Sequence, residues 1–145
     1  EVSQKYKEIK FEDKIIDAAC MDIVMNPNNY DTIVAPNFYG DILSDLVCGL
    51  VGGLGLAPGA NIGNESAVFE PVHGSAPDIA GKGIANPVSA ILSAVMMLKH
   101  IGFLEEAVKI ENSVNEIFIE GELTYDLGGK LNTKKFYEKI IKKIN

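Results

Sequence analysis

The feature that most constrains the fold is a glycine-rich run, GLVGGLGLAPGANIG, which places six glycines and one proline between Gly49 and Gly63. The helical spacing of apolar residues that leads up to this run fails here, because glycine gives the backbone its greatest conformational freedom. The preceding helix therefore ends at the run, which predicts either a crossing between two domains or a ligand-binding loop.

Glycine-rich runs invite a nucleotide-binding interpretation, but two familiar templates do not fit. After Gly53-Leu-Gly55, the position that needs the third glycine of a dinucleotide-binding fingerprint is Pro58. Gly81-Lys82 is followed by Gly83, where a phosphate-binding P-loop needs serine or threonine. The sequence thus contains neither a dinucleotide-fold fingerprint nor a P-loop.

Apolar periodicity on both sides of the run predicts alternating strands and helices. Short apolar or β-branched runs predict strands over residues 9–11, 31–36 and 67–72. Apolar residues at helical offsets predict helices over residues 1–8, 14–25, 40–50, 88–100, 105–119 and the lysine-rich tail from 132. A strand followed by a helix is typical of an α/β protein, and segment 31–36 suits a buried parallel strand.

Composition excludes several function classes. The chain has 145 residues, a net charge of −7 and no arginine, which argues against nucleic-acid binding. Its longest uncharged apolar run, residues 88–98, falls short of the ~20 residues that cross a bilayer, so we expect no membrane span. Cys20 and Cys48 lack metal-binding spacing and predict reduced thiols of a cytosolic protein. The chain opens with Glu1 and a charged stretch, so we expect no signal or transit peptide and a start inside a longer protein.

Asp41 and Asp45 in YGDILSD lie one helical turn apart, on one face of the predicted helix. Like charges at this spacing destabilise a helix by ~0.2–0.5 kcal/mol, and a bound divalent cation would reverse that sign. Mg²⁺ and Mn²⁺ prefer such hard oxygen ligands. Acidic pairs on helix faces are nevertheless common, so the spacing alone favours a helix cap for Asp41 and a solvated Asp45.

A polar segment, EPVHGSAPDIAG, holds Glu70, His73 and Asp78 together with two prolines, and no need of a hydrophobic core accounts for that combination. Taken singly, His73 is expected to bond nearby backbone and Asp78 to cap the loop. Taken jointly they favour a rigid ligand clamp. Asp78 could accept both hydroxyls of an adenosine ribose, whereas a 2′-phosphate there would meet a like charge.

Four stretches, NFYGDILSD, GGLGLAPGANIG, HGSAPDIAGKGIANP and TYDLGG, stand in an order and spacing that resemble the isocitrate, homoisocitrate and isopropylmalate dehydrogenase family over essentially the whole chain. The resemblance implies an α/β, two-domain fold with an open sheet, of which this chain is the C-terminal part. It assigns residues 1–51 to the second domain, which carries the dimer interface, and residues 52–145 to the first, cofactor-binding domain. A homodimer or larger homo-oligomer with shared active sites is implied.

The resemblance also implies the metal ligands. Asp41 and Asp45 match the metal-binding aspartates of one subunit, and Asp17, in IIDAACM, matches the aspartate that the partner contributes. The implied metal is Mg²⁺ or Mn²⁺. Once the resemblance is taken into account, the solvated pair is no longer the favoured interpretation.

The cofactor implied by the resemblance is NAD. The residues that match the family's cofactor loop are Glu70, His73, Gly74, Ala76, Asp78 and Asn86. Within this set, His73 and Asn86 are implied to lie near the adenine and Asp78 on its ribose. NADP-preferring members carry basic residues at and beyond the Asp78 position, where this chain has Asp78-Ile79.

The family's substrate-reading residues have no match here. The family holds substrate carboxylates with several arginines and uses a lysine and a tyrosine as acid and base, but this chain has no arginine and no lysine or tyrosine in the matching motif. Lysine does not replace arginine equivalently in bidentate carboxylate recognition. We therefore expect this machinery, and with it the catalytic residues, to lie upstream of Glu1.

The resemblance implies NAD-dependent oxidative decarboxylation of a small molecule, isocitrate, to a 2-oxo acid, CO₂ and NADH, in the cytoplasm or, in a eukaryote, the mitochondrial matrix. Homoisocitrate and 3-isopropylmalate are alternative substrates. A non-catalytic regulatory subunit is a further alternative, although such subunits tend to lose the metal aspartates that are all present here. A cofactor-binding fragment without its own activity is permitted by the missing arginines.

Overall fold

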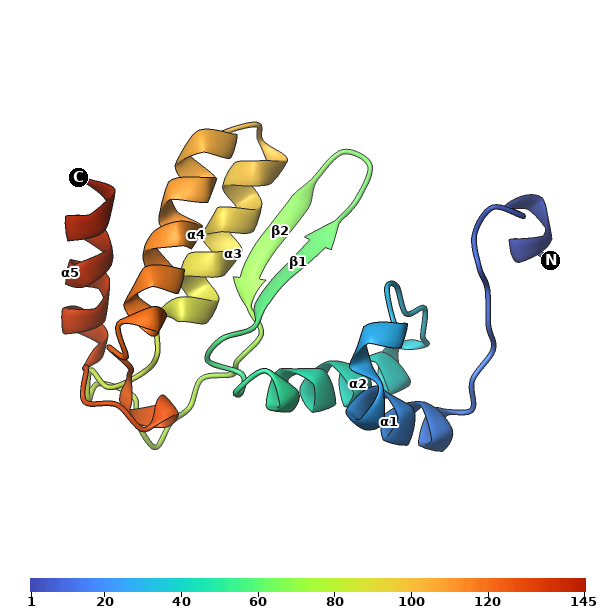
Figure 1. Ribbon diagram of the computed structural model, residues 1–145, viewed down its shortest axis with the longest axis horizontal. Coiled ribbons are helices and arrows are strands. Elements are labelled where there is room, and N and C mark those ends of the chain that lie inside the picture. Colours follow the sequence, from blue (N-terminus) through green and yellow to red (C-terminus); the bar gives the residue numbers. More distant parts are fainter. The chain divides into compact units, whose positions relative to one another are not determined.

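The computed structural model describes residues 1–145, which divide into two units, Glu1–Val47 and Cys48–Asn145 (Figure 1). The division falls inside a helix, a few residues before the boundary predicted at residues 51–52. The assignment of the two parts to named domains stays a prediction.

The first unit is built from two α-helices. α1 spans Ile16–Met25, and α2, Asn37–Leu50, begins in this unit and runs beyond it. Two 3₁₀ turns, η1 (Ser3–Lys5) and η2 (Pro27–Asn29), are its other regular elements. α1 ends at the Asn26-Pro27 pair, as predicted, because proline has no backbone N–H to continue the helical ladder.

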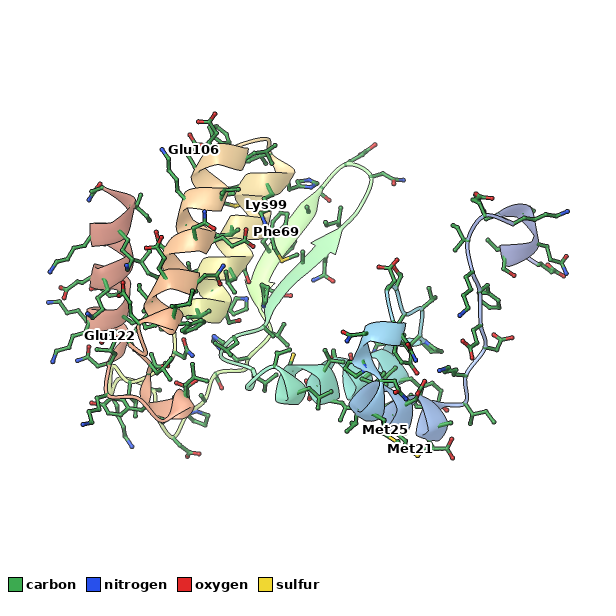
Figure 2. The ribbon with its side chains drawn as sticks, in the orientation of Figure 1. Met21, Met25, Phe69, Lys99, Glu106 and Glu122 are labelled. Atoms are coloured by element: carbon green, nitrogen blue, oxygen red, sulfur yellow. The ribbon has the colours of Figure 1, made fainter.

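Few apolar side chains of the first unit are buried. Ala19, Ile23 and Leu43 are buried. Met21 and Met25, one turn apart on α1, are instead 62% and 68% exposed (Figure 2). Along the part of α2 in this unit, Ile42 and Val47 are also exposed. Large apolar side chains exposed along a helix are often found where a protein contacts another chain.

A polar cluster joins the segment before α1 to the segment after it. Asp22 accepts hydrogen bonds from Tyr30 Oη at 2.7 Å, from Asn26 Nδ2 at 2.8 Å and from Lys14 Nζ. Lys14 Nζ also donates to Tyr30 Oη at 3.0 Å and lies 4.8 Å from the centroid of the Tyr30 ring. These three bonds hold the pKa of Asp22 well below its usual range, and the bond from Lys14 has the largest effect. The same bond raises the pKa of Lys14.

The second unit combines a β-hairpin with three helices. β1 (Pro58–Ile62) pairs antiparallel with β2 (Ala67–Pro71), with Gly59 opposite Glu70. The helices are α3 (Val88–His100), α4 (Leu104–Ile119) and α5 (Thr133–Ile144), and the 3₁₀ turn η3 (Tyr125–Leu127) precedes α5. α4 lies between α3 and α5, and the hairpin runs along α3 (Figure 1).

The hydrophobic core of the second unit lies between its three helices. Its buried members are Val88, Val114, Ile117, Phe136 and Ile140. The α4 pair is three residues apart and the α5 pair four, so each helix contributes one apolar face. Burying side chains of this size contributes roughly 1.5–3 kcal/mol each.

Two buried serines tie the hairpin to α3. Ser93 Oγ lies 2.9 Å from the carbonyl oxygen of Glu70 on β2, and Ser89 Oγ donates to the carbonyl oxygen of Ala57, just before β1, at 2.5 Å. The ring of Phe69 on β2, labelled in Figure 2, also packs against His100 at the end of α3, and the ring centroids are 5.5 Å apart. The position of both strands along α3 is therefore fixed by directional contacts.

Most predicted helices are confirmed. The helix over residues 88–100 matches α3, α4 begins one residue before its predicted start, and the tail helix is α5. Gly102, which follows α3, has a φ of +91°, a conformation that glycine adopts without steric cost. Residues 1–8 form only the turn η1. No helix of the chain is both long and apolar enough to cross a membrane.

The predicted strands at residues 9–11 and 31–36 are wrong, since neither segment forms a strand, and Val34, expected to be buried, is 95% exposed. A strand depends on the N–H and C=O groups of a neighbouring strand, and this chain supplies none for these two segments. β1 was not predicted, because Pro58 and Gly59 are depleted in strands. Pairing with β2 overrides that preference.

Replacing Asp22 with asparagine should make folding less sensitive to acid. The pKa of Asp22 is lower in the folded chain than its ordinary value of 3.8, so the carboxylate stabilises the fold above about pH 4 and the contribution is lost as the pH falls below it. Thermal unfolding followed from about pH 6 to about pH 2 should show a smaller fall in melting temperature for D22N than for wild type. The control is Asp31→Asn, at an exposed carboxylate without a hydrogen bond or ion pair. Equal acid sensitivity in all three proteins would contradict the role given to Asp22.

Candidate functional site

The paired aspartates of α2 are open to a ligand. Asp41 and Asp45 lie one turn apart, on one face of the helix, and both are exposed. Asp41 has one weak side-chain contact, from Asn37 Nδ2 at 3.4 Å to its Oδ2. Asp45 makes no hydrogen bond or ion pair, so neither carboxylate is neutralised within the chain.

Asp17 lies apart from that pair, in the first turn of α1. It is exposed, and its Oδ1 accepts a hydrogen bond from the backbone N–H of Ala18 at 2.6 Å. An acid in a first helical turn also has a structural role, because it complements the positive end of the helix dipole. No three His, Cys, Asp or Glu side chains of the chain form a metal site among themselves. The structure thus offers two carboxylates one turn apart on α2 and a separate one on α1, and the predicted division of metal ligands between subunits stays a prediction.

The predicted cofactor residues begin on β2. Glu70 is exposed, and its Oε1 accepts a hydrogen bond from Asn61 Nδ2 of β1 at 3.3 Å. His73 Nδ1 lies 2.9 Å from the carbonyl oxygen of Gly74. A carbonyl only accepts, so the Nδ1-protonated tautomer donates this bond and leaves Nε2 as a free acceptor.

The middle of the loop is formed by consecutive turns. Ala76 has a φ of +43°, the left-handed conformation, and its carbonyl oxygen accepts from the N–H of Ile79 at 3.0 Å. The carbonyl oxygen of Ile79 in turn accepts from the N–H of Lys82 at 3.1 Å. Asp78 projects from the first turn, is exposed and makes no hydrogen bond or ion pair. Both of its carboxylate oxygens can therefore accept hydrogen bonds from a ligand.

Asn86 differs from the other predicted cofactor residues because its side chain is buried, with 8% of the residue exposed. Its Oδ1 accepts from the N–H of Val88 at 3.0 Å, at the start of α3, and its Nδ2 donates to Asp126 Oδ2 at 2.9 Å. Asp126 was not predicted as a site residue, although TYDLGG is one of the four stretches that carry the family resemblance. The acid within that motif was the available signal.

All six predicted cofactor residues lie on one continuous stretch, from β2 to the start of α3, and the loop between residues 72 and 78 is exposed throughout. Two surface hollows lie elsewhere, one lined by residues 120–123 and 128–131 and the other by residues 104, 105, 108 and 109. The loop is therefore an open surface in this chain. It presents a carboxylate, an imidazole and free backbone groups to whatever approaches.

Comparison with known proteins places these motifs in a family. Residues 1–140 match the protein family described as isocitrate/isopropylmalate dehydrogenase. The chain is 57% identical over 140 residues to 3-isopropylmalate dehydrogenase of Archaeoglobus fulgidus, a match that covers 97% of this chain and 43% of that protein. It is 53% identical over 146 residues to a mitochondrial regulatory subunit of isocitrate dehydrogenase (NAD) from Dictyostelium discoideum, covering 99% of this chain and 41% of that protein.

A solved structure gives the same result for the fold. The crystal structure of isocitrate dehydrogenase from Methylococcus capsulatus matches the chain with a TM-score of 0.95 and 48% sequence identity, over 99% of this chain and 43% of that one. The fold is thus the α/β fold of that enzyme, and the chain spans about two fifths of the length of the proteins it matches. Because the family match runs from before the α1 aspartate to within the last helix, the chain belongs to the isocitrate/isopropylmalate dehydrogenase family.

Proposed function

We propose that the chain is the C-terminal part of an NAD-dependent, metal-requiring dehydrogenase that oxidises isocitrate at C2 and releases the carboxylate β to the new carbonyl as CO₂. The observation that carries this proposal is the family match over residues 1–140. Within that match, the acids of α2 and the acid of the cofactor loop are free to bind.

The α2 acids fit a divalent cation. Asp41 and Asp45 supply hard oxygen ligands from one helix face, and nothing in the chain offsets the charge of Asp45. A third carboxylate, Asp17 of the partner subunit, would complete a set that one copy does not assemble. Bound Mg²⁺ or Mn²⁺ would act as a Lewis acid that stabilises the charge developing during decarboxylation. The aspartates would hold and orient the cation and would take no part in proton transfer.

The loop after β2 fits a dinucleotide with a free ribose. NAD would supply the hydride acceptor. Asp78 would accept hydrogen bonds from the adenosine ribose hydroxyls and repel a 2′-phosphate, because its exposed carboxylate carries an unpaired negative charge. The free Nε2 of His73 would accept from the adenine amino group.

Substrate recognition and proton transfer belong, in this proposal, to residues outside the chain. Isocitrate carries three carboxylates, which arginine recognises best through paired N–H donors, and the chain contains no arginine. A homodimer or larger homo-oligomer would bring the partner's Asp17 to the α2 acids. The exposed apolar side chains of α2, Ile42, Val47 and Leu50, support such an association.

A non-catalytic regulatory subunit is the second candidate, favoured by the identity with the regulatory protein from Dictyostelium. Two open carboxylates one turn apart count against it, since a protein without metal chemistry gains nothing from their mutual repulsion. 3-Isopropylmalate is the main alternative substrate, because the Archaeoglobus relative is named for it.

The proposal is tested on the complete protein that contains this chain. NADH formation with Mn²⁺ should give the highest kcat/KM with isocitrate, ahead of homoisocitrate and 3-isopropylmalate, while the 145-residue chain alone should give no turnover. Preference for 3-isopropylmalate would move the assignment to that substrate. No turnover of any of the three by the complete protein would favour the regulatory role.

Asp45→Asn in the complete protein should weaken metal dependence far more than NAD binding. Asparagine keeps the shape of the side chain but removes the charge that offsets the cation. The metal concentration for half-maximal turnover should rise by at least the roughly 10–100-fold typical of lost metal-site contacts. Glu105→Gln on α4, an exposed acid without a partner, is the control. An unchanged metal titration in D45N would refute the assignment of α2 as the metal site.

Replacing Asp78 with lysine and Ile79 with tyrosine should move cofactor preference toward NADP. The change removes the charge that repels a 2′-phosphate and adds one that attracts it, so discrimination should shift by ~1–3 kcal/mol. The measurement is the ratio of kcat/KM for NAD and NADP. Glu65→Lys, in the hairpin turn, controls for a general gain of positive charge. If the ratio of kcat/KM for NAD and NADP is unchanged in the double variant, Asp78 does not determine the choice between the two cofactors.

A further inference from the structure

The C-terminal half of the predicted cofactor loop is held by a distant stretch of the chain. Asp126 of η3 accepts a hydrogen bond from Asn86 Nδ2 at 2.9 Å. Thr133, at the start of α5, donates from its N–H to the carbonyl oxygen of Gly83 at 3.0 Å, and from its hydroxyl to that of Ala85 at 2.5 Å. We call Asp126 and Thr133 the loop clamp.

Asp126 fixes which way the carboxamide of Asn86 faces. The N–H of Val88 needs an acceptor and the Asp126 carboxylate needs a donor, so only one orientation satisfies both. In the flipped orientation the amide oxygen would face the carboxylate and the amide nitrogen would face the N–H. Because Asn86 is 8% exposed, water cannot readily compensate for that loss.

A third segment closes the same cluster. A Cβ atom at Gly55 would lie 3.1 Å from both Asn86 Cβ and Asp126 Oδ2, and the carbonyl oxygen of Gly55 accepts from the N–H of Ser89 at 2.9 Å. The glycine-rich run, the end of the loop and the turn η3 therefore meet closely enough that a side chain at residue 55 would require Asn86 or Asp126 to shift by a few tenths of an ångström.

The other half of the loop has few contacts beyond its own turns. Between residues 72 and 78 every residue is exposed, and the polar contacts of this half are the bond from the N–H of Val72 to the carbonyl oxygen of Ala57 at 3.5 Å and the turn bonds at His73 and Ala76. At the β2 end, the loop is anchored by Ser93 through the Glu70 carbonyl. At the other end it is anchored by the loop clamp. The place of Asp78 is thus set from both ends of the loop, although Asp78 itself contacts neither anchor.

We infer that Asp126 is a positioning residue for the dinucleotide: it acts through Asn86 to hold the loop in the conformation that binds the adenosine half of the cofactor. This inference rests on the proposed NAD-binding function of the loop. Asp126 needs no contact with the cofactor for this role. A purely structural role, in which Asp126 only supports the start of α3, is the competing explanation.

The test compares Asp126→Ala and Asp126→Asn in the complete protein. Alanine removes the acceptor for Asn86. The KM for NAD should then rise roughly tenfold, as expected for the loss of one hydrogen bond to a charged group. The kcat should stay close to that of the wild type. Asparagine retains an acceptor oxygen for Asn86 and should recover most of the affinity. The matched control is Glu116→Ala on α4. It removes an exposed carboxylate whose Oε2 lies 3.0 Å from Lys143 Nζ of α5.

Two further measurements separate positioning from simple destabilisation. Hydrogen exchange of unliganded D126A should accelerate at residues 83–88 but not in α4, and E116A should leave the loop unchanged. Asn86→Ala combined with Asp126→Ala should cost no more NAD affinity than Asn86→Ala alone, because Asp126 acts only through Asn86.

The outcomes distinguish failure of this inference from failure of the proposed function. A wild-type protein that binds no NAD overturns both. A wild-type protein that binds NAD, with an affinity that D126A lowers no more than E116A does, overturns only the positioning role. A fall in kcat and in the affinity for every ligand, without recovery by asparagine, also overturns it in favour of a structural role.

Discussion

The buried face of α3 is the constraint on which the second unit depends. Val88 packs into the core between the helices, while Ser89 and Ser93, buried on the same helix, bond to the hairpin. Apolar burial is non-directional and brings helices together without fixing how far a strand can slide. The hydroxyl groups supply that direction. The loop that starts at the end of β2 takes the position of its first end from α3 through Ser93, and its other end leads into the same helix where the loop clamp holds it.

The sequence predicted those parts of the fold whose stabilisation is local. α3 and α5 carry apolar residues at helical spacing and begin at recognisable caps, such as Asn132, whose side chain accepts from the N–H of Lys135. The strand predictions fared worse, because a strand is defined by its neighbour. Val34 lies in a run with high strand propensity but has no neighbouring strand, whereas Gly59 has low propensity and pairs with Glu70.

The same distinction applies to the candidate site. Asp41 and Asp45 could be paired from the sequence because helical geometry alone puts them on one face. Asp78 could be singled out by its place in a polar loop. Asp126 could not be connected to Asn86, since forty residues separate them and their hydrogen bond exists only after α4 and the following turn have folded. A buried amide that contacts both a helix start and a distant acid leaves no periodic pattern in the chain.

One atom on α3 has a consequence for the choice of amino acid there. Ser93 has a single hydroxyl hydrogen but two carbonyl oxygens within reach, that of Glu70 at 2.9 Å and that of Ser89 at 2.8 Å. Rotation about one C–O bond moves this hydrogen between the strand and the helix, while the backbone stays in place. A side chain of equal size without a hydroxyl would fill the same space but could not form a hydrogen bond to the hairpin. The same oxygen also accepts from the N–H of Gly59 on β1 at 3.4 Å, so residue 93 needs a hydroxyl for its hydrogen bonds rather than for its side-chain volume.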